Sequence, residues 1–236
     1  MLSKNEIKEI RALGQKKFRD ERGLFVVEGE KLVDEALHSE FEVVRHFRIE
    51  EIGEDAMARI SQLTHPSPAL AVVRQPEPIQ PAIEPDELVL ALDGIRDPGN
   101  LGTILRIADW FGIHQILASE DTVELYNPKV VQATMGAIFR VRVHYCDLPV
   151  VMPGLTGYLP IYGTFLEGDN IYETPLTEGG IIVMGSEANG ISPEVAATVT
   201  RKLHIPPFPP DAHTSESLNV AVATAITCAE FRRRKA

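Results

Sequence analysis

The sequence predicts an α/β protein in which a parallel-sheet domain follows a smaller α/β domain. From residue 88 onward, short apolar runs alternate with helical segments, the pattern of a parallel sheet covered on both faces. Residues 1–75 show a shorter alternation of the same kind. Between them lies "QPEPIQPAIEP", residues 75–85, with four prolines that disfavour helix and interior strand. We therefore predict a first domain at 1–75, a linker at 76–86 and a second domain at 87–236.

Apolar runs and helical periodicity place the individual elements. In the first domain we expect helices at 3–19, 30–39 and 54–63 and strands at 24–29, 41–47 and 70–74. In the second domain we expect strands at 88–92, 114–118, 140–145, 160–164, 180–185 and 202–206. The helices between and after these strands are expected at 101–111, 127–138, 193–199 and 216–233. Ligands of such sheets bind beyond the carboxyl ends of the strands, so the loops there decide function.

The composition is that of an ordinary globular protein. Of 236 residues, 44% are hydrophobic and 24% charged, and no apolar run is long enough to cross a bilayer. The start of the chain lacks the apolar segment of a secretory signal. Cys146 and Cys228 suit neither a disulfide framework nor a metal site. We expect a cytoplasmic protein without a structural metal.

The net charge of −11 excludes a protein coated in positive charge, but not a local nucleic-acid face. Residues 8–22 form a locally basic stretch, and the RNA-binding candidates within it are Lys16, Lys17, Arg19 and Arg22. A solvated helix face explains the same charges equally well.

The stretch "LVLALDGIRDPGNLGTILRIADWFG", residues 88–112, has the outline of a phosphate-binding loop. Its glycines, Gly94, Gly99 and Gly102, fit neither a dinucleotide fingerprint nor a P-loop. The loop instead carries Asn100, and Arg106 follows inside the helix. At about 100° per residue, Arg106 points away from the apolar face of that helix. The alternative is a solvated arginine beside an aromatic neighbour.

Two further loops carry polar groups at strand or helix ends. In "IIVMGSEANGIS", residues 181–192, Glu187 follows the strand that ends at Gly185, and Gly190 precedes the next helix. In "SESLNVAVATAITCAE", residues 215–230, Ser217 and Asn219 bracket Leu218 at the start of a helix, whose free N–H groups can hold polar ligand atoms. Simple turn formation and helix capping explain each loop when it is taken alone.

Together and in this order, the three motifs resemble those of the SpoU (TrmH-type) RNA 2′-O-ribose methyltransferases of the SPOUT superfamily. "NPKVVQATMGAIFRVRV", residues 127–143, resembles a helix of the same family. "KKFRDERGLFVVEGEKLVDEAL", residues 16–37, resembles the small substrate-binding domain, related to ribosomal protein L30e, that often precedes it.

The resemblance implies methyl transfer from S-adenosylmethionine to a ribose 2′-hydroxyl of ribosomal RNA, or alternatively of transfer RNA. It also implies a trefoil knot, a homodimer and no metal. The catalytic residues it implies are Arg106, Asn100, Glu187, Ser217 and Asn219. The cofactor-binding positions it implies are Thr164, Gly185, Ile205 and Leu218. The sequence departs from the family at "PFPPDAHTSE", residues 207–216, which lacks the usual glycine.

Two other functions fit the sequence less well. An RNA-binding or ribosome-assembly protein of the same fold without catalysis is disfavoured by the complete set of motif residues. A nicotinamide-dependent oxidoreductase is disfavoured by the glycine spacing and by the missing acidic residue after the next strand.

Overall fold

The computed structural model describes residues 2–209 and 217–233, and the chain forms two compact units. The first comprises residues 1–78 together with 124–140, and the second comprises 79–123 and 141–236. The predicted second domain, 87–236, is therefore interrupted by a segment that belongs with the first unit. No helix among the described residues is both long and apolar enough to cross a membrane.

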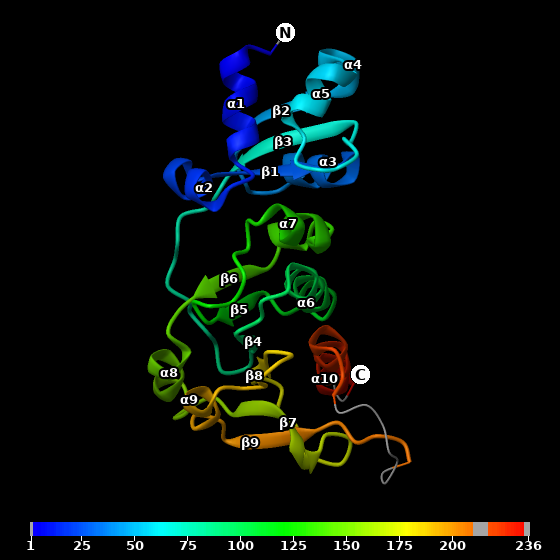
Figure 1. Ribbon diagram of the computed structural model, residues 1–236. Helices are drawn as coiled ribbons and strands as arrows, with labels where there is room; N and C mark the ends of the chain where they lie inside the picture. The colour runs from blue at the N-terminus through cyan, green and yellow to red at the C-terminus, as the bar shows by residue number, and fades with distance from the viewer. Residues whose placement is uncertain (1, 210–216, 234–236) are drawn as a thin grey trace. The chain divides into compact units, whose positions relative to one another are not determined.

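The first unit contains a three-stranded antiparallel sheet in the order β1-β3-β2 (Figure 1). Its strands are β1 (Leu24–Glu28), β2 (Val43–Arg48) and β3 (Ala69–Arg74). Its helices before the linker are α1 (Lys4–Ala12), α2 (Lys16–Arg22), α3 (Glu30–His38), α4 (Ile49–Ile52) and α5 (Glu54–Ile60). The helix predicted over 3–19 is two helices, because Leu13 and Gly14 close α1 with turn hydrogen bonds to Ile10 and Arg11.

Both faces of this small sheet are buried, which explains why β1 and β3 read as continuous apolar runs. One face packs on α1 and α5; its core residues include Ile10, Val26, Met57, Leu70 and Val72. The opposite face packs on α3, which contacts all three strands. The segment 124–140, which carries α7 (Pro128–Thr134) and the 3₁₀ turn η1 (Ala137–Phe139), packs on β1 of the same sheet.

Aromatic contacts hold the segment 124–140 in the first unit. The Phe25 ring lies 4.7 Å from that of Tyr126, and the Phe41 ring meets that of Phe139 edge-on at 5.2 Å, centroid to centroid. Phe25 is fully buried. Because these rings remove large apolar areas from water, the segment completes the core of the first unit.

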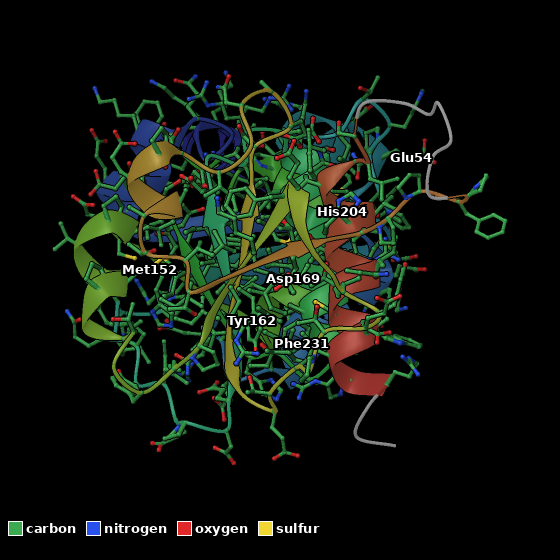
Figure 2. The ribbon with its side chains drawn as sticks, turned by 90° about the horizontal axis from the view of Figure 1, so that it is seen from below. Glu54, Met152, Tyr162, Asp169, His204 and Phe231 are labelled. Atoms are coloured by element: carbon green, nitrogen blue, oxygen red, sulfur yellow. The ribbon has the colours of Figure 1, made fainter. Side chains whose placement is uncertain are left out.

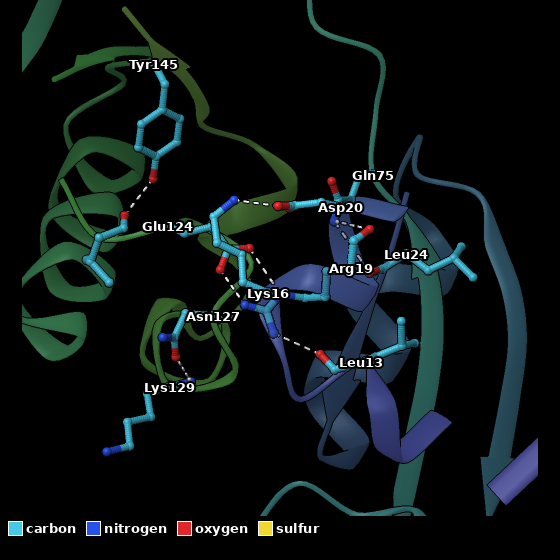
Figure 3. A network of polar contacts seen from close by, with 11 residues as sticks. Leu13, Lys16, Arg19, Asp20, Leu24, Gln75, Glu124, Asn127, Lys129 and Tyr145 are labelled. Carbon is cyan, nitrogen blue, oxygen red and sulfur yellow. Dashed lines mark hydrogen bonds and ion pairs between the residues drawn. The ribbon is translucent and has the colours of Figure 1, made fainter. Parts of the chain in front are cut away.

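A buried ion pair adds to this attachment (Figure 3). The Arg19 guanidinium donates through Nε and Nη2 to the carboxylate of Glu124, with the Nε contact at 3.0 Å, and through Nη1 to the Leu13 carbonyl at 2.8 Å. The Arg19 side chain is only 3% exposed. The Arg19–Glu124 pair joins residues that are adjacent in space but 105 positions apart in sequence.

The second unit contains a six-stranded parallel sheet in the order β6-β5-β4-β8-β7-β9. Its strands are β4 (Leu88–Asp93), β5 (Gln115–Ala118), β6 (Arg142–Tyr145), β7 (Ile161–Asn170), β8 (Gly180–Gly185) and β9 (Arg201–His204). Its helices are α6 (Pro98–Trp110), α8 (Leu148–Val151), α9 (Pro193–Ala196) and α10 (Val220–Arg233), with a 3₁₀ turn η2 (Met152–Gly154).

Helices cover both faces of this sheet, as predicted. On one face α8, η2 and α9 pack on a core that includes Val89, Met152 and Ile181. On the other, α10 packs beside α6 and contacts β8 (Figure 1). The Tyr162 ring of β7 meets the Phe231 ring of α10 edge-on at 5.0 Å, and Figure 2 shows Met152 and Phe231 on opposite sides of the sheet.

Two features of the C-terminal region bear on the predictions. The last helix begins at Val220, because residues 217–219 are not helical. The path that would close a trefoil knot runs between β9 and α10, and residues 210–216 of that stretch lie outside the described residues. The knot and the conformation of the glycine-free stretch therefore stay predictions.

Candidate active site

Asn100 lies in the first turn of α6, directly beyond the carboxyl end of β4. Asp97 caps this helix by accepting a hydrogen bond from the Asn100 amide at 2.8 Å, and Pro98 occupies the first turn. A capping carboxylate followed by proline is a strong helix start. The cap fixes the backbone of Asn100, so its side chain has a defined position at the edge of the sheet.

Glu187 lies in a tight loop after β8. Ser186 and Gly190 close this loop through two backbone hydrogen bonds of 3.0 and 2.8 Å. Gly190 has a positive φ of 66°, a conformation that glycine adopts without strain. A Cβ on Gly185 would lie 2.1 Å from the carbonyl carbon of Gly190. The glycines at both ends are thus required for the loop to fold back over the end of the strand.

Asp93 ties this loop to the neighbouring strand, a role that the sequence did not predict. Its Oδ2 accepts a hydrogen bond of 2.6 Å from the Ser192 amide, and Asp93 is only 8% exposed. β4 and β8 are paired as far as Asp93 and Gly185. Asp93 therefore fixes the position of the Glu187 loop relative to the loop that leads to Asn100.

Asn219 caps α10. Its Oδ1 accepts hydrogen bonds from the amides of Ala221 and Val222 at 3.0 and 3.2 Å. The capping role that the sequence offered as an alternative for Ser217 thus belongs to Asn219. Ser217 is exposed and precedes it by two residues.

The side chains of Glu187, Asn100 and Asn219 form one continuous hydrogen-bonded chain. Asn100 Nδ2 donates to Glu187 Oε1, and Asn219 Nδ2 donates to Asn100 Oδ1 at 3.0 Å. A carboxylate only accepts, so Asn100 must offer it the NH₂ group; its oxygen then faces Asn219. Asn219 must donate in turn, which leaves its own oxygen for the helix amides. The chemistry of the four groups therefore fixes the orientation of both amides.

Arg106 does not take part in this chain. It lies on the exposed face of α6, about 9 Å along the helix axis from Asn100 at 1.5 Å per residue. Within the described residues its side chain forms no hydrogen bond or ion pair. Trp110, one turn further on, is 84% exposed. The predicted orientation of Arg106 away from the core is confirmed, together with the exposed tryptophan beside it.

Three of the four predicted cofactor positions lie on or next to the neighbouring strands β7, β8 and β9. Thr164 comes directly after the last β7–β8 pair, Gly185 ends β8, and Ile205 follows β9. Thr164 Oγ1 donates to the Val183 carbonyl at 3.2 Å, so its hydroxyl is already occupied. Leu218, the fourth position, is 48% exposed next to Asn219. Backbone groups and apolar side chains at one edge of a sheet are what an uncharged heterocycle such as adenine requires, so these positions fit the adenosine part of S-adenosylmethionine.

The four predicted RNA-binding cations are mostly engaged within the protein. Lys16 Nζ lies 2.6 Å from Asp20 Oδ2, and Lys17 Nζ lies 3.9 Å from a Glu21 oxygen, both exposed pairs within α2. Arg22 is exposed and donates to a backbone carbonyl at 3.4 Å. The expectation for Arg19 needs correction, because Arg19 is buried and bonded as described above.

No group of three or more His, Cys, Asp or Glu side chains in the described part of the chain is arranged to hold a metal ion. A hollow of about 550 Å³ between the end of β7 and the start of β9 is lined by residues such as Asp169, Glu173 and Arg201. It contains none of the predicted site residues.

Comparison with known proteins identifies the family. Residues 87–229 match the SpoU rRNA Methylase family, and residues 4–56 match the MRM3-like substrate binding domain. The chain belongs to the SpoU rRNA methylase family. This confirms the resemblance carried by the three motifs.

Similar proteins cover nearly the whole chain. The 23S rRNA (guanosine(2553)-2′-O)-methyltransferase RlmP of Bacillus subtilis is 31% identical over 98% of this chain and 97% of its own. A solved structure of a protein assigned to the TrmH family of RNA methyltransferases, from Porphyromonas gingivalis, is 42% identical, with a TM-score of 0.89 and 99% of both chains covered. The AdoMet-bound rRNA methyltransferase from Sinorhizobium meliloti is 29% identical, with a TM-score of 0.86 over 99% of this chain and 96% of that one.

Proposed function

We propose that this protein is an S-adenosylmethionine-dependent RNA 2′-O-methyltransferase that modifies a guanosine ribose of ribosomal RNA in the cytoplasm. The single observation that best supports this is the hydrogen-bonded chain of Glu187, Asn100 and Asn219, because it joins all three family motifs in one array. The names of the full-length relative and of the AdoMet-bound neighbour support the nucleotide class and the cofactor.

The reaction needs an oxygen placed in line with an activated methyl group. When bound, S-adenosylmethionine supplies the methyl group on a sulfonium, which leaves as a neutral thioether. The protein must orient the 2′-hydroxyl and stabilise the charge that develops on its oxygen, while the hydroxyl proton passes to an acceptor, which we assign to a phosphate of the RNA. Thr164, Gly185, Ile205 and Leu218 would hold the cofactor at the ends of the strands.

Arg106 is assigned to the ribose oxygen. A guanidinium does not release its proton at working pH, so it is not a general base. Its five donors instead suit orientation of the hydroxyl and stabilisation of the developing alkoxide. Arg106 is exposed and has no partner among the described residues. This supports the role, because an arginine that stabilises the fold would be paired. Ser217 completes the third motif beside the capping residue.

A homodimer is part of the proposal. Trp110 is 84% exposed and Val222 is 49% exposed, and they lie on α6 and α10, which pack together. Exposed large apolar side chains on neighbouring helices are typical of a surface that meets a partner. We assign this surface to a second copy, which receives Arg106 near its own Asn100 and Asn219.

Mixed dimers test this arrangement. A dimer of one Arg106→Ala protomer and one Asn219→Ala protomer retains one complete site if Arg106 acts on the partner's site. In an equal mixture about half of the dimers are mixed and each of these has one complete site of two, so we expect about a quarter of the wild-type rate, well above the rate of either variant alone. No recovery on mixing, in a preparation shown by light scattering to be dimeric, would mean that Arg106 acts within its own protomer.

Activity itself is tested by incubating the protein with tritiated S-adenosylmethionine and in vitro transcribed 23S rRNA, then mapping 2′-O-methyl positions. We expect one methylated guanosine. Arg106→Lys should lower turnover strongly, since a lysine cannot offer paired donors in one plane. The alternative, an RNA-binding assembly factor without catalysis, would show RNA binding but no cofactor binding by calorimetry at millimolar concentration.

A further inference from the structure

In the first unit, three exposed cations lie together on α1. Lys4, Lys8 and Arg11 are all exposed, and their spacing of four and three residues places them on one side of the helix. At about 100° per residue, Lys4 and Arg11 lie within about 60° of Lys8, nearly opposite the buried Ile10. We call these three cations the α1 crest.

Within the described residues the crest cations have no ion-pair partner, unlike Lys16, Lys17 and Arg19 of α2. Among the described residues, the side chains of Lys4 and Lys8 form no hydrogen bond or ion pair. Arg11 has no carboxylate within ion-pair distance, although its charge partly opposes the burial that raises the pKa of Glu28. The nearest acidic residue along the helix, Glu9, projects about 100° away from Lys8. The crest is therefore a locally unneutralised positive stripe.

We infer that the α1 crest contacts RNA phosphates and docks the substrate on the first unit. This inference rests on the proposed function, because it assigns a surface to the same RNA substrate. Unpaired surface cations on a chain with net charge −11 are where a polyanion is attracted rather than repelled. Lys4 and Arg11 are about 10 Å apart along the axis, so the three cations can face successive phosphates of one RNA strand.

The ion pairs of α2 provide the contrast. Lys16 and Lys17 must leave Asp20 and Glu21 before they can meet a phosphate, so each gains little by doing so. The crest cations release only bound counterions, and this release favours binding and makes it salt-dependent. RNA that binds through counterion release is recognised by its phosphates and not by its base sequence.

The experiment compares two full-length variants that differ in where charge is removed. One carries Lys4→Gln, Lys8→Gln and Arg11→Gln, and the control carries Lys16→Gln and Lys17→Gln; glutamine preserves helix propensity in both. Binding to in vitro transcribed 23S rRNA is measured by filter binding at several salt concentrations. Each phosphate contact contributes about 0.7 to 0.9 to the slope of log K against log salt. We therefore expect the slope to become shallower by about 2 to 3 for the crest variant, which loses three contacts.

For the control pair we expect less than half of that change per charge removed. Methylation assays add a second readout: KM for RNA should rise at least tenfold in the crest variant, while kcat at saturating RNA stays within twofold. An unchanged slope and KM in the crest variant would overturn the inference. So would an equal loss per charge in both variants, because net charge alone would then explain binding. If the wild-type protein binds RNA but does not methylate it, the proposed function fails while the binding slopes still test the crest.

Discussion

Replacing Asn219 separates the stability of α10 from the integrity of the active site. Its Oδ1 caps the helix through the amides of Ala221 and Val222, whereas its Nδ2 holds Asn100. Asn219→Ala removes both functions. Asn219→Asp keeps a capping oxygen but replaces the donor with an acceptor that faces the Asn100 oxygen.

The two substitutions should therefore have opposite effects on stability. Loss of an N-cap costs about 1 kcal/mol, which lowers Tm by about 2–4 °C for a chain of this length. A carboxylate cap at the positive end of α10 is stabilising by about 0.3–1 kcal/mol. Thermal unfolding should thus show Asn219→Ala below wild type and Asn219→Asp at or above it.

Activity should fall in both variants. Asn100 cannot satisfy Glu187 and an aspartate at position 219 at once, because its one NH₂ group would face two carboxylates. A lost hydrogen bond of about 1–1.5 kcal/mol corresponds to about a tenfold drop in kcat/KM. Asn219→Ser, which caps but is too short to reach Asn100, should lose activity without the added charge. Wild-type kcat/KM in Asn219→Asp would refute the proposed chain and reduce Asn219 to a cap.

Three further substitutions follow from the contacts described. Gly185→Ala should abolish cofactor binding by calorimetry, because its Cβ would lie 2.1 Å from the backbone of the following loop; relief of that overlap costs about 1–3 kcal/mol in thermal unfolding. A hydrogen bond from Arg45 is the main cause that lowers the pKa of Glu6 to about 2. The ionised carboxylate therefore stabilises the fold above pH 4.5, its pKa in the unfolded chain, and this contribution is lost as the pH falls toward 2. Carboxyl NMR should show that midpoint, and Arg45→Gln should raise it; an unmoved midpoint contradicts the pairing. Arg19→Ala should lower the free energy of unfolding, measured in urea, by about 3 kcal/mol. This is the lower end of the range for a broken buried ion pair, because the Glu124 side chain is 20% exposed. A change below about 1 kcal/mol would mean that the pair is solvated.

The parallel sheet was predictable because its signals are local. The central strands β4, β5 and β8 are short apolar runs bounded by turn residues, and Ser192-Pro193 marks the start of α9 in the sequence itself. The glycine spacing of the first loop excluded nucleotide-binding templates without any structure. The identity of the motif residues came from the family resemblance, which residue patterns alone did not supply.

The errors concern contacts between residues that are distant in sequence. Nothing near Arg19 indicates that its partner is Glu124, 105 residues later, so an exposed cation and a buried one look alike in the sequence. The bond from Ser192 to Asp93 spans 99 residues and was missed for the same reason. The pairs of Lys16 and Lys17, in contrast, are visible in the sequence at a spacing of four residues.

The return of residues 124–140 to the first unit has a consequence for dissecting the protein. A fragment cut at the proline-rich stretch after residue 78 would lack Tyr126 and Phe139, leaving Phe25 and Phe41 without their ring partners. Such a fragment would expose apolar surface at these two rings, and we expect it to self-associate. The small sheet is thus not an independent module, because part of its core comes from a helical segment that lies between two strands of the second unit in the sequence.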